Sequence, residues 1–104
     1  MSSFRTYDLS VRFYREVSAL RLPSHLKSQL LRSASSVPLN LREGEARGSM
    51  PDRLRFYRIA YASFRESQAA LELAALQIDA SFSDLIDHLG ASLYKLVNQR
   101  RPFC

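Results

Sequence analysis

Apolar side chains recur every three or four residues through most of the chain, which is the spacing of amphipathic helices and not of strands. Four helical segments follow from this pattern. In the first, over residues 7–20, the apolar face is formed by Leu9, Phe13, Val17 and Leu20. Polar and charged residues occupy the other faces of this segment, so we expect it to bury one stripe against neighbouring helices.

The second segment, over residues 24–46, has an apolar stripe that continues through a proline. The stripe consists of Leu26, Leu30, Ala34, Val37 and Leu41. Pro38 lies within it, removes one backbone donor and crowds the carbonyl four residues earlier. The continuity predicts one helix kinked at Pro38. The alternative is a pair of shorter helices that meet at Val37–Pro38.

Glycine, proline and serine mark the ends of the segments. The clearest boundary is residues 48–52, where Gly48 can end one helix and Ser49 can cap the next. Ser24 is the expected cap of the second segment, after Pro23. Ser83 is the expected cap of the fourth segment, at the end of a connection that begins at Asp79.

The third segment is expected to reach Ile78, and its apolar sector is unusually wide. One stripe contains Phe56, Ala60, Ser63, Ser67, Ala70 and Ala74, and beside it lie Tyr57, Tyr61, Phe64, Leu71 and Ile78. Such a sector can pack within a bundle and still leave apolar surface for another subunit.

The fourth segment has its apolar face at Ile86, Leu89, Leu93 and Leu96 and ends near Arg100–Arg101. Short connections between helices of similar length favour antiparallel neighbours. Residues 1–104 are therefore predicted to form a single all-α domain, an antiparallel up-down-up-down four-helix bundle.

Charge adds a preference for anionic partners. The 104 residues carry a formal net charge of +5, and thirteen of the fifteen basic residues are Arg. Arginine pairs with phosphate or carboxylate at two points, so this composition suits nucleic acid, but it equally suits salt bridges within or between subunits.

The lone cysteine, Cys104, can form no intrachain disulfide, which favours a reducing compartment. No stretch resembles a secretory signal or a membrane span. We therefore expect a cytoplasmic protein that does not enter a membrane.

Candidate catalytic chemistry is sparse. His25 and His88 have no partners with metal-ligand spacing, so no metal and no cofactor is expected. Glu43 and Glu45 lie among arginines, where salt bridges are the simpler interpretation. We expect Glu66 to be partly buried in an ion pair that fixes helix register. The sequence thus predicts a protein that is not an enzyme.

Five arginines are the candidate nucleic-acid contacts. They are Arg47, Arg53, Arg55, Arg58 and Arg65. Tyr57 and Tyr61 interleave with them and could stack on bases. The alternatives are a solvated helix face with salt bridges for the arginines and core positions for the tyrosines.

Two stretches resemble a known family. Residues 29–44 contain a Val-Pro-x-Asn-x-x-Glu-Gly element from Val37 to Gly44, and residues 56–66 read FYRIAYASFRE. Both are similar to proteins encoded in intervening sequences of bacterial 23S ribosomal RNA genes. The matched positions are Pro38, Asn40, Glu43, Gly44, Ser63 and Glu66, for which the resemblance implies packing and helix pairing.

The resemblance implies a homopentamer of four-helix bundles with a central channel. Related accessory proteins of diversity-generating retroelements are basic, bind nucleic acid and act with a reverse transcriptase, so RNA, DNA and such a protein are candidate partners. This chain departs from the family pattern at Arg42 and after Ser63, which changes the charge near the expected kink and on the third helix.

Two functions follow as hypotheses. The first is a non-enzymatic, homo-oligomeric bundle that contacts the backbone of RNA or DNA through arginines. The second is a scaffold for protein–protein interaction that uses the wide apolar face of the third helix and binds no nucleic acid.

Overall fold

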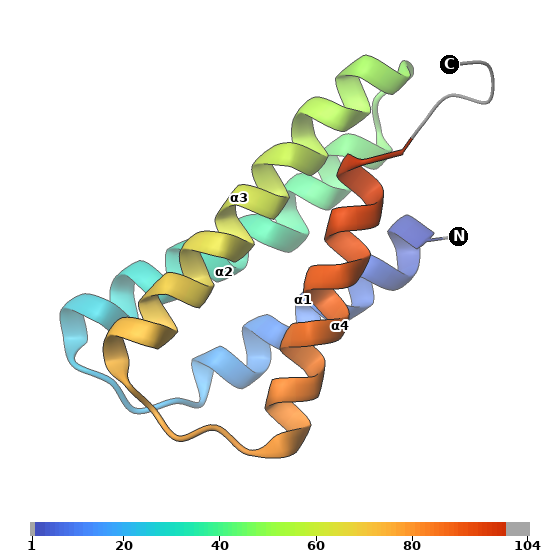
Figure 1. Ribbon diagram of the computed structural model, residues 1–104. Coiled ribbons are helices and arrows are strands. Elements are labelled where there is room, and N and C mark those ends of the chain that lie inside the picture. The colour runs from blue at the N-terminus through green and yellow to red at the C-terminus, as the bar shows by residue number, and fades with distance from the viewer. Residues whose placement is uncertain (1, 100–104) are drawn as a thin grey trace.

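The computed structural model describes residues 2–99, and the side chains of residues 5–99. These residues form four helices, α1 (Ser2–Ser18), α2 (Ser24–Glu45), α3 (Met50–Ala74) and α4 (Ala80–Val97), and no strand (Figure 1). The prediction of an all-α, four-helix protein is confirmed. Cys104 and the Arg100–Arg101 pair lie outside the described residues.

Each helix packs against two others, and consecutive helices run in opposite directions (Figure 1). The α2–α3 pair has the most extensive contact, and α3–α4 the least extensive of the four packed pairs. The molecule is elongated, with principal extents of 46 × 24 × 19 Å. None of the four helices combines the length and apolar character needed to cross a bilayer.

The core runs along the middle of the four helices. Phe13 of α1 lies at its centre, with its ring centroid 5.5 Å from that of Phe64 on α3 and 6.0 Å from that of Phe82 on α4. The largest side chains that are almost fully buried also include Val17, Leu30, Val37, Leu41, Leu89, Leu93 and Leu96. The stripes of the sequence therefore face this core as expected.

Two helix starts differ from the predicted ones. Pro23 stands at the N-cap of α2 without a side-chain hydrogen bond, so the cap assigned to Ser24 is wrong. Asp79 caps α4 and accepts a hydrogen bond from the Phe82 amide at 2.8 Å, so the cap assigned to Ser83 is wrong. Aspartate is a strong capping residue, and the earlier start brings Phe82 into the core beside Phe13.

The predicted start of α3 is confirmed, and its predicted end is wrong. Ser49 accepts a hydrogen bond from the Asp52 amide at 3.3 Å, as predicted for the cap. At the other end, α3 stops at Ala74 and not near Ile78. Ala75 adopts a left-handed conformation with φ of 54°, which ends the helix without a glycine.

Helix α2 continues through Pro38 as a single element. The alternative of two shorter helices that meet at Val37–Pro38 is therefore wrong. A kink at Pro38 stays a prediction.

Candidate nucleic-acid interface

The α2–α3 pair approaches closely because a glycine faces a tyrosine. Gly44 is buried, and a Cβ atom added to it would lie 2.6 Å from Cε1 of Tyr57 and 3.3 Å from the Arg53 carbonyl oxygen. Such distances leave no room for a side chain. Tyr57 is 3% exposed, so it packs against α2 and is not free to stack on a base.

Serine hydroxyls connect α2 and α3 near the middle of the two helices. Ser33 and Ser67 lie 2.7 Å apart, and Ser36 and Ser63 lie 2.8 Å apart. Asn40 donates to the Ser36 hydroxyl at 2.9 Å. Small polar side chains thus satisfy one another while they allow the two backbones to come together.

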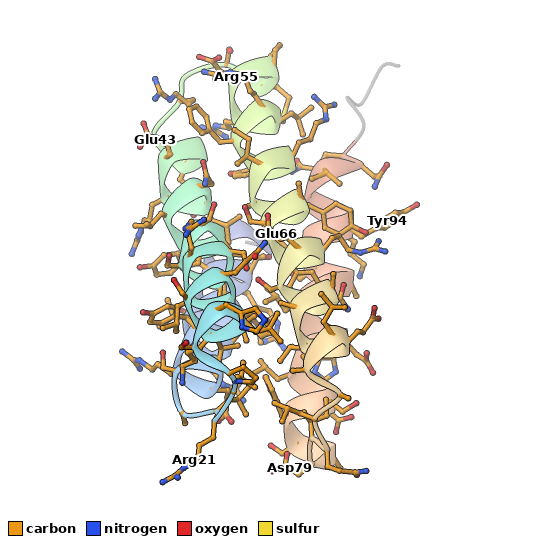
Figure 2. The ribbon with its side chains drawn as sticks, turned by 90° about the vertical axis from the view of Figure 1, so that its left-hand side faces the viewer. Arg21, Glu43, Arg55, Glu66, Asp79 and Tyr94 are labelled. Carbon is orange, nitrogen blue, oxygen red and sulfur yellow. The ribbon has the colours of Figure 1, made fainter. Side chains whose placement is uncertain are left out.

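The matched positions of the family resemblance all lie on this helix pair. Pro38, Asn40, Glu43 and Gly44 belong to α2, and Ser63 and Glu66 belong to α3. Figure 2 shows Glu43 near one end of α2 and Glu66 midway along α3.

Glu66 differs from its predicted environment. Its side chain is exposed, and it accepts a hydrogen bond from the Gln29 side-chain amide at 3.2 Å. The expectation of a partly buried ion pair is therefore wrong, because residue 66 lies on the α3 face that turns from the core toward solvent. Gln29 was not anticipated as its partner.

Three of the five predicted arginines gather where α2 ends and α3 begins. We call Arg47, Arg53 and Arg55 the arginine corner; Figure 2 shows Arg55 at this end of the molecule. The guanidinium carbons of Arg47 and Arg55 lie 4.7 and 4.4 Å from the ring centroid of Phe56. These cations are held over an aromatic ring.

Each arginine of the corner also has a hydrogen-bonded or ionic partner. Arg47 pairs with Glu43, and Arg55 lies 3.6 Å from a carboxylate oxygen of Asp52. Arg53 donates from Nε to the Arg47 carbonyl oxygen at 2.9 Å. The corner therefore organises the α2–α3 connection as well as presenting positive charge.

The salt bridge between Arg42 and Glu45, beside the corner, was also expected. Arg42 lies 3.4 Å from Glu45, which with the Arg47–Glu43 pair confirms the salt-bridge interpretation of these glutamates. The Arg42 guanidinium lies 4.1 Å from the Tyr7 ring centroid, and this tyrosine raises the pKa of Arg42. Tyr7 was missed because it comes from α1, far away in sequence.

The other two predicted arginines, Arg58 and Arg65, are exposed on α3, and Arg65 lines the side of α3 that faces α4. Arg58 lies one helical turn before Tyr61. Neither arginine contacts a carboxylate among the side chains of residues 5–99. Arg65 lies 3.5 Å from the Tyr61 hydroxyl, and the Tyr61 ring meets Tyr94 of α4 edge-on at 6.4 Å. We call Arg58, Tyr61, Arg65 and Tyr94 the arginine–tyrosine patch.

Tyr94 was not predicted, although the sequence contained a signal for it. It lies outside the apolar stripe of α4, and 57% of its surface is exposed. Its side chain points outward from α4 in Figure 2. A large aromatic residue on a polar helix face is a typical binding contact.

A groove runs between α3 and α4 and shares Tyr61 and Arg65 with the patch. Its first hollow has a volume of about 410 Å³ and is lined by Tyr61, Phe64, Arg65, Gln68, Ala69, Glu72, Ile86, Asp87, Gly90 and Ala91. A second hollow shares Gln68, Glu72 and Ile86 with it and extends toward the α3–α4 connection. We call the two together the α3–α4 groove.

The histidines occupy separate exposed positions on α2 and α4. Among residues 5–99, no group of three or more His, Cys, Asp or Glu side chains is placed to hold a metal ion.

The fold and surface define a small all-α protein with an arginine-rich exterior. Residues 4–96 match the family model described as 23S rRNA-intervening sequence protein. The chain therefore belongs to this family, and the resemblance seen in the sequence is confirmed. No curated protein matches the chain.

Proposed function

We propose that the protein is a non-enzymatic helical protein that binds the phosphate backbone of RNA or DNA, chiefly single-stranded segments, through the arginine–tyrosine patch. The observation that carries this proposal is the position of Arg58 and Arg65, which are exposed and have no carboxylate partner among the described side chains. Unpaired guanidinium groups are available to phosphate.

The spacing of the two arginines suits a backbone that follows the helix. They are seven residues apart on α3, which corresponds to about 10.5 Å along the helix axis and nearly the same face. Tyr94 lies across from them on α4, through Tyr61. Arginine contacts to phosphate combined with an exposed aromatic ring are typical of surfaces that bind unpaired bases.

The test is fluorescence anisotropy of a labelled single-stranded RNA against nuclease-treated protein across a salt series. The expected result is binding whose logarithmic affinity falls linearly with the logarithm of salt concentration. Replacing both Arg58 and Arg65 by Ala removes two phosphate contacts, so the slope is expected to fall by about 1.4 for a single strand.

A matched control distinguishes the effect of net charge from the effect of where the arginines lie. The Arg15→Ala/Arg32→Ala double variant loses the same charge from two exposed arginines, on α1 and α2. We expect this control to retain most of the slope. Equal losses in both variants would mean that net charge and not the patch carries binding, and absence of binding in low salt would contradict the proposal.

The scaffold function has weaker support. The wide apolar sector predicted for α3 is mostly used inside the bundle, since Tyr57, Ala60 and Phe64 are buried. Ile59 and Leu73 remain exposed, at 41% and 75%, but they are fourteen residues apart. A continuous apolar docking face is therefore absent from the described part of α3.

Self-association into a homopentamer remains part of the proposal, and it is supported by membership of the family and by the resemblance behind it. Light scattering coupled to size-exclusion chromatography is the test. A pentamer would give five times the 11.9 kDa mass of the chain. A monomer at high protein concentration would contradict this part without affecting the nucleic-acid result.

A further inference from the structure

Charge is divided between two parts of the chain. Residues 42–65 contain six Arg and three acidic residues, whereas residues 66–94 contain five acidic residues and neither Lys nor Arg. Helix α3 spans both parts, so the division becomes a separation along the molecule. In Figure 2, Arg55 lies at one end and Asp79 at the other.

The acidic part borders the α3–α4 groove. Glu72 and Asp87 line the groove from opposite helices, and both are exposed. Within residues 5–99, neither carboxylate has a cationic partner. Apolar side chains of Leu71, Leu76, Ile78 and Ile86 line the adjoining hollow of about 250 Å³.

The arginine corner has the complementary chemistry. It presents cations and the ring of Phe56, which is partly exposed between Arg47 and Arg55. The Arg55–Asp52 pair is long, at 3.6 Å, and largely exposed. Exposed pairs of this kind contribute little to stability, so the arginine can exchange its partner at small cost.

We propose that the α3–α4 groove of one copy binds the arginine corner of a second copy. Arg53 and Arg55 of the corner pair with Glu72 and Asp87, since guanidinium and carboxylate groups match at two points. The Phe56 ring then contacts the apolar lining of the groove. This inference rests on the proposed self-association and assigns surfaces to it.

The two surfaces lie toward opposite ends of an elongated chain, so one copy cannot satisfy both by itself. The contact is head-to-tail, because each copy offers a corner to one neighbour and a groove to another. Repeated head-to-tail contacts generate a closed ring or an open filament. They do not generate a two-fold dimer in which the same surface faces itself.

The experiment is a set of charge reversals examined by sedimentation velocity in low salt. The groove variant is Glu72→Arg/Asp87→Arg, and the corner variant is Arg53→Glu/Arg55→Glu. A quadruple variant combines all four changes. Each single-surface variant is expected to lose at least tenfold in association constant, because like charges then face each other across the contact.

The quadruple variant restores opposite charges with the signs exchanged, and it is expected to recover the mass of the unaltered protein. Mixing the groove and corner variants is also expected to restore association, since the altered surface of each complements that of the other. Because only unlike copies then pair, a closed ring of the mixture must alternate the two variants and hold an even number of copies. Failure of both the quadruple variant and the mixture to recover association would overturn the proposed pairing.

Matched controls carry the same charge changes elsewhere. They are Asp8→Arg/Glu16→Arg and Arg15→Glu/Arg32→Glu, all at exposed positions of α1 and α2. These variants are expected to associate like the unaltered protein, and circular dichroism confirms that every variant folds. If the controls dissociate as much as the groove variant, net charge and not the groove is responsible, which overturns the inference.

The outcome separates two failures. An unaltered protein that stays monomeric contradicts self-association as a whole. If the unaltered protein assembles and the groove variant has the same mass as it, only the docking surfaces assigned here are contradicted. The nucleic-acid proposal has its own readout, the salt dependence of RNA binding, but it shares Tyr61 and Arg65 with the lining of the groove.

Discussion

Helix α3 makes two different kinds of contact, a close one with α2 and a looser one with α4. Toward α2 it meets a glycine and a row of serines, and the two helices form the most extensive contact of the bundle. Toward α4 it borders a groove whose α4 side is formed by Ile86, Asp87, Gly90 and Ala91. The first contact fills its space, whereas the second leaves surface open.

The difference shows how one helix can support a fold and offer a binding surface. Small residues on both α2 and α3 let the two backbones come close together. The close packing between them makes this helix pair rigid. Between α3 and α4, Phe64 lies against Gly90, and the groove beside it is lined by both polar and apolar side chains. We therefore expect a methyl group added at a glycine to have opposite effects on stability on the two sides.

The largest expected effect is on the looser side, where Phe64 lies between Phe13 of α1 and Gly90 of α4. Phe64→Ala removes a ring that is 1% exposed and packs on Phe13. Truncation of a buried phenylalanine costs about 3–5 kcal/mol of unfolding free energy. Urea denaturation followed by circular dichroism measures it. A loss below about 1 kcal/mol would show that the α3–α4 contact does not depend on this ring.

Gly44→Ala tests the close side. The added methyl group would lie 2.6 Å from the buried Tyr57 ring, so helix α2 or the ring must shift. Overpacking costs about 1–3 kcal/mol, and the better helix propensity of alanine returns about 1 kcal/mol. A net loss of stability in urea denaturation is expected.

Gly48→Ala is the control for this substitution, since nothing lies within 4 Å of the position where its Cβ would be. Its free energy of unfolding should change by less than about 0.5 kcal/mol. Equal stability of the Gly44 and Gly48 variants would contradict the close approach of α2 and α3.

The buried hydroxyl pair between α2 and α3 gives a smaller effect. Ser33 and Ser67 are almost fully buried and hydrogen-bonded at 2.7 Å. Replacing either by Ala is expected to cost about 1 kcal/mol, since Ser33 can still donate to the Leu30 carbonyl oxygen. A double-mutant cycle should give a coupling of at least about 0.5 kcal/mol. Strict additivity would mean that the two hydroxyls act independently.

The smallest effect is expected for Gly90→Ala, the counterpart of Gly44→Ala on the α4 side. The added Cβ would lie 3.1 Å from the Phe64 ring, so the ring needs to give way by only a few tenths of an ångström. The gain in helix propensity of about 1 kcal/mol then offsets the contact. Thermal and urea unfolding should show unchanged or slightly higher stability. A loss as large as that of Gly44→Ala would remove the distinction between the two sides.

The helices themselves could be predicted because their periodicity is strong. The stripes on Phe13, Leu30 and Leu89 identified buried positions correctly, and Ser49 was recognised as a cap. The family was recognisable from the proline-containing element of α2 and the aromatic run of α3. These features depend on short-range spacing, which a sequence displays directly.

Other features could not be predicted, because they depend on tertiary packing or lack a sequence signal. The end of α3 at Ala74 was not predicted, because a left-handed alanine at residue 75 has no strong sequence signal. The roles of the arginines could not be separated either. Arg47 and Arg55 are held by Phe56 and by acidic neighbours, whereas Arg58 is not. Only the packed structure distinguishes them.

The most direct test of the proposed binding surface is photocrosslinking with a single-stranded RNA that contains 4-thiouridine, followed by mass spectrometry. The account predicts crosslinks at Tyr94 and at Tyr61, and their loss when Arg58 and Arg65 are both replaced by Ala. Crosslinks confined to α1 or to the exposed face of α2, unchanged by those substitutions, would contradict it.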